Sequence, residues 1–254
     1  MDATQLDYDL PEELIAQTPL ADRSASRLLC LTRGAQDLDH RHVTDLPELL
    51  PSSLIILNDN KVIPARLFLF KPSGGRVEFL LVERVGEPAP DGAERSFALG
   101  RTHKGVRLDM SLQSENGWLS ARVLELPGGG EVLLELRARE ANVEQALARV
   151  GHLPPYIRRA PDAADLTRYQ TVFAAHAGAV AAPTAGLHLN EALLTQLTAR
   201  GHELAYVTLH VGPGTFAPLR AAELSQHRMH AERYVVPEAT ARAIASAKQS
   251  GRPV

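Results

Sequence analysis

Hydrophobic and polar positions are patterned most clearly between residues 179 and 216. Two apolar runs, residues 179–182 and 204–211, each end at a loop of small residues and have the length of a buried strand. Between them, apolar side chains recur at helical spacing over residues 191–200, with Asn190 as N-cap and Gly201 as C-cap. The pattern predicts a βαβ unit whose loops lie at the carboxyl edge of a parallel sheet, where open α/β sheets bind ligands.

The two loops of this unit allow close contact with a ligand. They read PTAG at residues 183–186 and GPGT at residues 212–215. Side chains this small let a ligand approach the backbone, whose N–H groups can hold an anion or a carboxylate. His188 and His210 stand beside the loops, where an imidazole can transfer protons. The alternative is that both loops are ordinary tight turns with structural histidines.

The first 63 residues carry a less regular pattern. Apolar runs at residues 27–32 and 54–57 predict strands, residues 6–10 alternate as a short strand does, and Thr44 caps a short predicted helix. Cys30 is expected to be a buried small hydrophobe. As the single cysteine, it excludes a disulfide within the chain and a thiol-rich metal site.

From residue 62 to residue 137 the pattern predicts strands and no helix. The strand-like runs are separated by segments rich in glycine and proline, and they cover residues 65–70, 76–84, 95–99, 106–112, 118–126 and 131–137. Runs at this spacing favour a small antiparallel barrel or sandwich. A helix over residues 142–150 follows, with Asn142 and Gln145 as a capping box.

The predicted fold class is α/β, with two domains. A discontinuous α/β catalytic domain is formed by residues 1–63 and 151–254, and a small antiparallel β-barrel domain, residues 64–150, is inserted into it. A predicted helix over residues 237–249 is followed by a glycine and by residues 252–254, which resemble the start of another strand. We therefore interpret the chain as C-terminally truncated; a frayed tail is the alternative.

Composition narrows the class of protein. The 254 residues are 44% hydrophobic and 22% charged, which suits one large or two smaller globular domains. A net charge of −3 and a pI near 6.4 exclude binding of nucleic acid through overall charge, so any such contact needs a local basic patch. Because the chain shows neither a signal peptide nor about 18 consecutive apolar residues, we expect a cytoplasmic protein without a membrane partner.

Further chemistry is possible in two regions. The segment HRMHAE at residues 227–232 places His227 and His230 at i and i+3, with Glu232 two residues further on, a set that suits acid–base chemistry or a zinc or iron site. Basic residues interleaved with aromatic residues are typical of surfaces that bind nucleic acid. The alternative is that these residues form an ordinary charged surface exposed to solvent. They are Arg101, His103, Lys104 and Arg107 on one hairpin, and Arg158, Arg159 and Arg168 with Tyr156 and Tyr169 near the second half.

Several segments together resemble the S-adenosylmethionine:tRNA ribosyltransferase-isomerase family of queuosine biosynthesis. They read LNDNKVIPARL, GGRVEFLLVE, HLPPYIRR, RYQTVF, GAVAAPTAGLHL, TLHVGPGTF and HRMHAE, and they follow one another in the family's order over nearly the whole chain. The resemblance implies an α/β catalytic domain interrupted by a barrel, in agreement with the pattern above.

The resemblance also implies the reaction. The ribosyl part of S-adenosylmethionine is transferred to 7-aminomethyl-7-deazaguanine at the tRNA wobble position and isomerised, giving epoxyqueuosine with release of adenine and methionine. S-adenosylmethionine is a co-substrate, tRNA is the partner, no prosthetic group or metal is expected, and we expect a monomer. Such a site needs a base for the acidic C5′ proton, a proton donor for adenine, and loops for the methionine carboxylate.

We assign residues to these tasks as hypotheses. Candidates for proton transfer are His188, His210, His230 and Glu232. Candidates for substrate binding are Asn58, Arg66, Tyr169, Gln170, Pro183, Thr184, Gly186, Gly212, Gly214 and Thr215, with Tyr169 stacking on a base and Gln170 hydrogen-bonding to it. Arg158, Arg159 and Arg168 would hold tRNA phosphate.

Two departures from the family pattern are visible. Leu189 stands where the family usually has Phe, a change that apolar packing should tolerate. Family members continue past Val254 through GTTS-type and NFHLP-type segments, so inactivity of this chain alone is one expectation. Two other functions stay open: a non-catalytic tRNA-binding module, and a His/Glu metallohydrolase that rests on residues 227–232.

Overall fold

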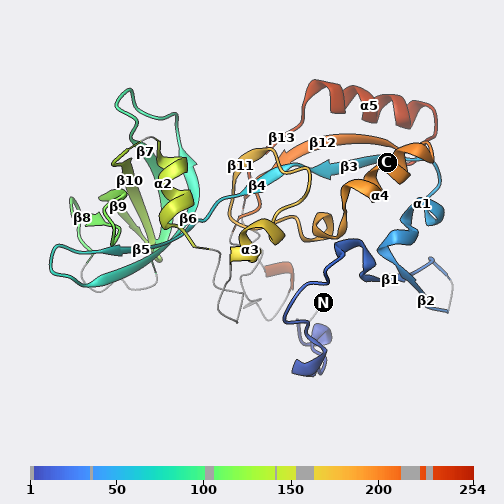
Figure 1. Ribbon diagram of the computed structural model, residues 1–254, viewed down its shortest axis with the longest axis horizontal. Helices are drawn as coiled ribbons and strands as arrows, with labels where there is room; N and C mark the ends of the chain where they lie inside the picture. The colour runs from blue at the N-terminus through green and yellow to red at the C-terminus, as the bar shows by residue number, and fades with distance from the viewer. Residues whose placement is uncertain are drawn as a thin grey trace.

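The computed structural model describes residues 3–34, 37–100, 106–140, 142–152, 163–212, 224–226 and 231–254. A closed barrel lies at one end of the molecule, and sheets flanked by helices lie at the other (Figure 1). The chain passes from one part to the other through strands β3 (Leu54–Asn58), β4 (Asn60–Val62) and β5 (Arg66–Phe70). An α/β fold with an inserted antiparallel barrel, as predicted from the sequence, is confirmed.

The barrel is closed in the order β10-β7-β6-β5-β8-β9, with antiparallel pairing throughout. Besides β5, its strands are β6 (Arg76–Val85), β7 (Glu94–Gly100), β8 (Ser111–Gln113), β9 (Leu119–Gly128) and β10 (Glu131–Ala138). Alternate side chains such as Leu67, Leu69 and Phe79 are fully buried inside it. The open choice between barrel and sandwich is thereby settled in favour of the barrel.

Helix α2 (Val143–Val150) packs against β9 and β10 and adds its buried apolar side chains to the barrel core. Its N-cap is the predicted one, because Asn142 Oδ1 accepts the N–H of Gln145 at 2.8 Å. The predicted strand over residues 106–112 is wrong, since only β8 forms there. The chain turns at Asp109, whose φ is +59°, and its N–H bonds to Val123 O.

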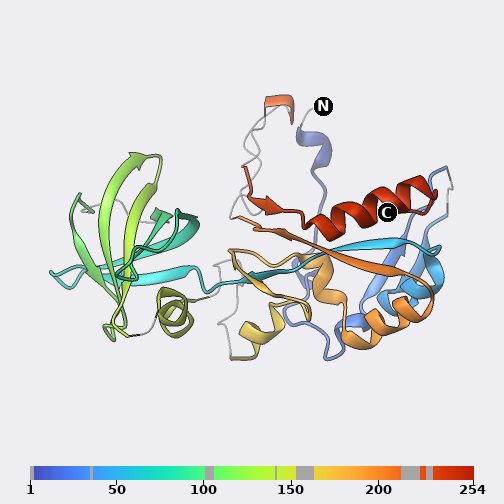
Figure 2. The ribbon, with the colours of Figure 1, turned by 90° about the horizontal axis from the view of Figure 1, so that it is seen from above.

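The second part is built on two parallel strand pairs and one short antiparallel pair. Strand β12 (Glu203–Leu209) pairs with β3 in parallel and with β13 (Tyr234–Val235) in antiparallel fashion, while β11 (His176–Ala179) pairs with β4 in parallel. Helix α4 (Glu191–Ala199) packs on one face of β3 and β12, and α5 (Glu238–Gln249) packs on the other (Figures 1 and 2). The result is a sheet with a helix on each side.

The predicted βαβ unit requires a correction. Strand β11 ends at Ala179, where the predicted strand begins, and it does not neighbour β12 in one sheet. Residues 179–182 are buried as predicted, but the N–H groups of Val180 and Ala181 both donate to Val211 O, at 3.0 and 3.2 Å. Both strands nevertheless run parallel to the β3–β4 segment, so their carboxyl ends share one edge.

The N-terminal region packs beside this sheet as short elements. They are 3₁₀ helices η1 (Ala3–Leu6), η2 (Glu12–Leu14), η3 (Arg23–Ala25) and η4 (Val43–Asp45), strands β1 (Arg27–Cys30) and β2 (Asp39–His42), and helix α1 (Leu46–Leu49). The strand predicted at residues 6–10 is wrong. Cys30 is half-buried rather than buried, because β1 pairs with β2, whose side chains are all exposed.

The remaining described elements are short: α3 (Ala163–Arg168), η5 (Thr184–His188) and η7 (Leu224–Gln226). The last residues of the chain return to the sheet. Pro253 O accepts the N–H of Leu54 at 2.9 Å, which places the final residues beside β3. Among the helices described, none combines the length and apolar character needed to cross a bilayer.

Candidate functional site

A buried polar cluster lies where β3 ends. Asp59 and Asn60 are 9% and 0% exposed, at the carboxyl edge that the sheet presents to a ligand. One Asp59 oxygen, Oδ1, accepts the hydroxyl of Thr208 at 2.7 Å, and the other, Oδ2, lies 3.6 Å from Nε2 of His176. A carboxylate held in this way is fixed in place and faces an imidazole.

His210 adjoins this cluster from the end of β12. A Cβ on Gly178 would lie 2.9 Å from Nδ1 of His210, so the ring packs directly over this glycine, whose φ is +140°. Nδ1 is buried, and none of the described residues is a hydrogen-bond partner for it. Burial lowers the pKa of His210, and the positive charge of Arg233 lowers it further. Both influences disfavour the charged imidazolium form of His210.

Glu232 holds the start of the second small-residue loop. Its Oε1 accepts the N–H of Gly212 at 2.8 Å. The neighbouring Arg233 pairs with Glu83 of the barrel at 2.8 Å, and its backbone oxygen accepts the N–H of His210 at 2.9 Å. These bonds bring the barrel strand β6 to the same edge as His210.

The first small-residue loop forms the 3₁₀ helix η5, which Pro183 precedes as N-cap and which contains Thr184 and Gly186. A Cβ at Gly186 would lie 3.0 Å from the Thr171 side chain and 3.1 Å from that of Phe173, so a larger residue would have to push these side chains aside. Close packing of this kind fixes the path of the loop.

His188 ends this loop and lies against η3. Its Nδ1 is 3.0 Å from the hydroxyl of Ser26, and its backbone oxygen accepts the hydroxyl of Ser24 at 3.0 Å. Sequence reasoning placed His188 and His210 alike beside the loops. The structure gives them different surroundings, because His188 is exposed and hydrogen-bonded whereas the Nδ1 of His210 is buried.

Asn58 and Gln170, both predicted to bind substrate, use their amides on the backbone. Asn58 Oδ1 accepts the N–H of Leu209 at 2.9 Å, and its Nδ2 donates to the oxygen of the same residue at 3.0 Å. Gln170 pairs with Val62 in the same fashion, at 3.0 and 2.7 Å. Each amide thus imitates a neighbouring strand and supports the sheet edge.

Arg66 and Arg168 also have partners within the protein. Arg66 pairs with Glu78 at 2.9 Å and lies 4.9 Å over the ring of Phe68. The guanidinium of Arg168 donates to the backbone oxygens of Leu20 and Ala21. Five predicted site residues lie outside the described part of the chain: Arg158, Arg159, Gly214, Thr215 and His230.

Sequence reasoning missed Asp59 and His176 as members of the site. The signal was the polar run Asn58-Asp59-Asn60-Lys61 at a strand end, which does not reveal which side chain points inward.

Within the described ranges, no group of at least three His, Cys, Asp or Glu side chains is arranged to hold a metal ion.

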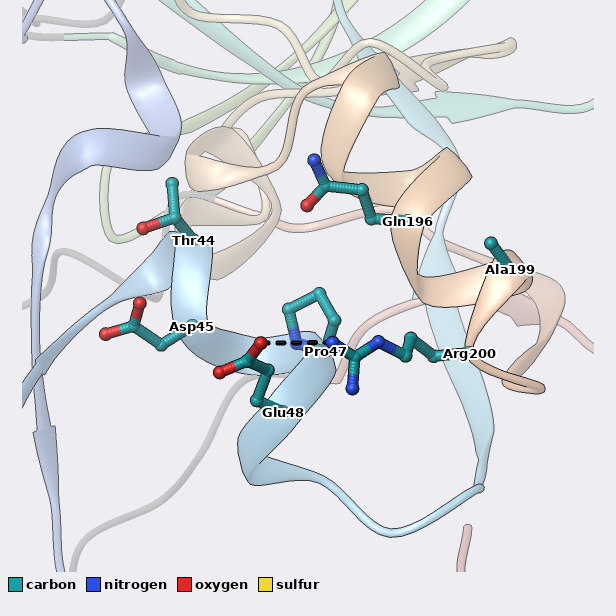
Figure 3. A pocket seen from close by; sticks show the side chains of 7 residues that line it. All are labelled: Thr44, Asp45, Pro47, Glu48, Gln196, Ala199 and Arg200. Atoms are coloured by element: carbon teal, nitrogen blue, oxygen red, sulfur yellow. Dashed lines mark hydrogen bonds and ion pairs between the residues drawn. The ribbon is translucent and has the colours of Figure 1, made fainter.

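A hollow of about 310 Å³ lies between α1 and α4, away from this site (Figure 3). The ion pair between Glu48 and Arg200, at 3.0 Å, crosses it. Arg200 precedes β12, whereas His210 follows it. The hollow therefore belongs to the amino end of the sheet and has no part in the predicted chemistry.

Comparison with known proteins shows that nearly the whole chain matches one protein family. The model of the family described as queuosine biosynthesis protein matches residues 3–254. The S-adenosylmethionine:tRNA ribosyltransferase-isomerase of Anaeromyxobacter sp. (strain Fw109-5) is 50% identical over 258 residues, which cover 100% of this chain and 73% of the relative. The protein of the same name from Azoarcus sp. (strain BH72) is 48% identical over 248 residues, covering 96% and 69%.

Among solved structures, the chain is similar to the S-adenosylmethionine tRNA ribosyltransferase of Thermotoga maritima. The identity is 29% and the TM-score 0.41, over 98% of this chain and 67% of that chain.

Proposed function

The chain belongs to the queuosine biosynthesis protein family, and from this premise we propose that it is an S-adenosylmethionine:tRNA ribosyltransferase-isomerase. In the proposed reaction it transfers the ribosyl part of S-adenosylmethionine to 7-aminomethyl-7-deazaguanine at the tRNA wobble position. Isomerisation then gives epoxyqueuosine, and adenine and methionine are released.

The reaction requires proton transfer in a protected site. The sulfonium acidifies the neighbouring C5′ proton, so a base can remove it, and the departing adenine needs a proton. The single observation that supports this chemistry is the polar cluster at the carboxyl edge, where buried Asp59 faces His176 and where burial lowers the pKa of the neighbouring His210. Titratable groups with such contrasting environments are typical of acid–base sites.

The other residues take supporting roles in this proposal. The loops at residues 183–186 and 212–215 cradle S-adenosylmethionine, with Glu232 fixing the second through its bond to Gly212. His188, His210 and His230 are the proposed groups for proton transfer. Arg158, Arg159 and Arg168 are proposed to hold tRNA phosphate, while Asn58, Arg66, Tyr169 and Gln170 support or contact the substrates.

We also propose the organisation of the protein around this site. Residues 64–150 form the barrel domain, and residues 1–63 and 151–254 form the catalytic domain. The protein acts as a cytoplasmic monomer, without a prosthetic group. The ion pair of Glu83 with Arg233 supports a site that both domains border.

Mass spectrometry of nucleosides tests the proposed reaction. Purified chain is incubated with S-adenosylmethionine and tRNA that carries the precursor base, beside the Anaeromyxobacter relative as positive control. Epoxyqueuosine from both proteins is the expected result. Product from the relative alone, together with tRNA binding by this chain and no binding of S-adenosylmethionine, would favour a non-catalytic tRNA-binding module instead.

A further inference from the structure

The outer face of the hairpin formed by β5 and β6 carries aromatic and basic side chains. Alternation along β5 turns Leu67 and Leu69 into the barrel, where both are fully buried, and leaves two phenylalanines partly exposed on the outer face. These two rings and the basic side chains beside them form the hairpin patch, which consists of Arg66, Phe68, Phe70, Lys71 and Arg76. Because both rings lie outside the barrel core, packing of that core does not account for them.

Phe68 holds two guanidinium groups at this surface. The Cζ atom of Arg66 lies 4.9 Å from the centre of the ring, and that of Arg76 lies 4.8 Å from it. Arg66 precedes Phe68 by two residues, whereas Arg76 pairs with Phe70, which follows Phe68 by two residues. The two side chains therefore reach the ring from opposite ends of the hairpin. Attraction between each cation and the ring restrains both side chains, so they lose less conformational freedom when they bind a partner.

The hairpin has an excess of positive charge. Residues 66–78 contain three cations and one carboxylate, which are Arg66, Lys71, Arg76 and Glu78. The carboxylate pairs with Arg66 at 2.9 Å. His152 packs edge-on against Phe68, with ring centroids 5.0 Å apart, and its pKa is lowered by burial and further by the charge of Arg66. Because the whole chain has a net charge of −3, attraction of a polyanion requires a local excess of this kind.

Strand β6 connects the hairpin patch to the candidate site. It begins at Arg76, at the outer end of the hairpin, and returns toward the second part of the molecule, where Glu83 pairs with Arg233 at 2.8 Å (Figure 1). The backbone oxygen of Arg233 accepts the N–H of His210. Arg76 and Glu83 are about 23 Å apart along the strand, at about 3.3 Å for each residue. A ligand that contacts both the patch and the site must therefore be much larger than a nucleoside.

We propose that the hairpin patch binds RNA, with the guanidinium groups of Arg66 and Arg76 on phosphate oxygens and Phe68 as the platform that positions them. A planar guanidinium matches the geometry of a phosphate and can bind two of its oxygens at once. Aromatic rings among basic side chains are the combination with which proteins hold single-stranded nucleic acid. This inference rests on the proposed function, which makes tRNA the partner, and extends it to a surface of the barrel outside the catalytic edge.

Salt-dependent binding of tRNA tests the patch without any turnover. The dissociation constant is measured by fluorescence anisotropy with labelled tRNA at salt concentrations from about 50 to about 200 mM, because each phosphate contact makes binding more sensitive to salt. Arg76→Gln should weaken binding about 3- to 10-fold and make the slope of log affinity against log salt less steep by about 1. Thermal unfolding shows whether each variant remains folded.

Arg122→Gln is the matched control, because it removes the same charge from the outer face of β9, where the Arg122 side chain is 55% exposed. It should change the affinity by less than about twofold. Phe68→Leu and Arg76→Lys separate the ring from the charge. Both keep every cation, so the salt slope should stay as it is, while Phe68→Leu should weaken binding about 3-fold because the guanidinium groups lose their platform.

Equal affinities and equal salt slopes in Arg76→Gln and Arg122→Gln would overturn the inference and leave the proposed function intact; the patch would then serve another partner, such as an acidic protein. Failure of the unsubstituted chain to bind tRNA would overturn the inference as well. Absence of epoxyqueuosine from a chain that binds tRNA would instead count against the proposed function, and the comparison of the two variants would still decide the role of the patch.

Discussion

The hydroxyl of Tyr169 accepts the backbone N–H of Ala182 at 3.1 Å, at the point where the first small-residue loop begins. Ala182 is 3% exposed, so Tyr169→Phe leaves this N–H buried and without its acceptor. We expect unfolding to become easier by about 1–3 kcal/mol, with reduced turnover because the loop loses its anchor. Urea unfolding and the nucleoside assay measure the two effects.

Tyr169→Leu is the matched variant, because it removes the aromatic ring as well as the hydroxyl. If the ring also stacks on a base, only the leucine variant should weaken tRNA binding. Unchanged stability in Tyr169→Phe would mean that the hydroxyl is not needed to anchor the loop.

Gly178 leaves the space that the ring of His210 occupies. In Gly178→Ala the new Cβ would lie 2.9 Å from Nδ1 and 3.0 Å from Cε1, so the imidazole must move. Displacement of a reacting group can cost up to about 100-fold in rate, and we expect a loss of about 10–100-fold in turnover.

Gly86→Ala is the control for backbone strain. Gly86 also has a positive φ, of +71°, but a Cβ there meets nothing within 4 Å. Both substitutions should destabilise the chain by about 1–3 kcal/mol, and only Gly178→Ala should lower turnover. Equal turnover in the two variants would show that the position of His210 is not critical.

Lowering the pH should destabilise the folded chain through His210 and His152. Burial lowers the pKa of both below their ordinary value of 6.5, with Arg233 and Arg66 as the next largest influences. Below that value the unfolded chain binds more protons than the folded chain. The free energy of unfolding therefore rises with pH through this window and is lost as the pH falls from 6.5 through each lowered pKa.

Urea unfolding at a series of pH values checks this dependence. His210→Gln and His152→Gln should each flatten the decline in stability between about pH 7.5 and about pH 5.5, and the double variant should flatten it further. A decline as steep in the double variant as in the unsubstituted chain would contradict the assignment.

The barrel could be predicted from the sequence because its determinants are local. Alternation of buried and more exposed side chains, with glycine-rich turns between, identifies strands such as β6 and β9 directly. Residues 106–110 misled the prediction, since Val106 and Met110 pack against the core from either side of a turn at Asp109 and not from a strand.

The site was only partly predictable, because its bonds join residues far apart in the sequence. The Asn58 and Gln170 amides replace missing strand partners at Leu209 and Val62, and nothing in a polar side chain distinguishes this use from substrate binding. His176 becomes a site residue only when β11 pairs with β4 and brings it to Asp59. The loops themselves were visible as runs of small residues.

The core of the barrel is nearly self-contained, so residues 64–150 should fold alone. Among the described residues, Val180 is the one fully buried member of this cluster that lies outside that range. The Arg149 guanidinium lies 4.0 Å over the ring of Trp118 and ties α2 to the start of β9. Cooperative thermal unfolding, followed by circular dichroism and by fluorescence of the single tryptophan, is the expected behaviour of the isolated segment.

Core and surface leucines provide the comparison for this segment. Leu134 is fully buried, and its replacement by alanine should cost about 2–5 kcal/mol, whereas Leu99→Ala removes a side chain that is 37% exposed and should cost much less. If the isolated segment is only marginally stable, it should lose its cooperative unfolding transition in Leu134→Ala and keep it in Leu99→Ala. If residues 64–150 show no transition at all, the barrel depends on contacts such as that of Val180, and the proposed domain boundaries are wrong.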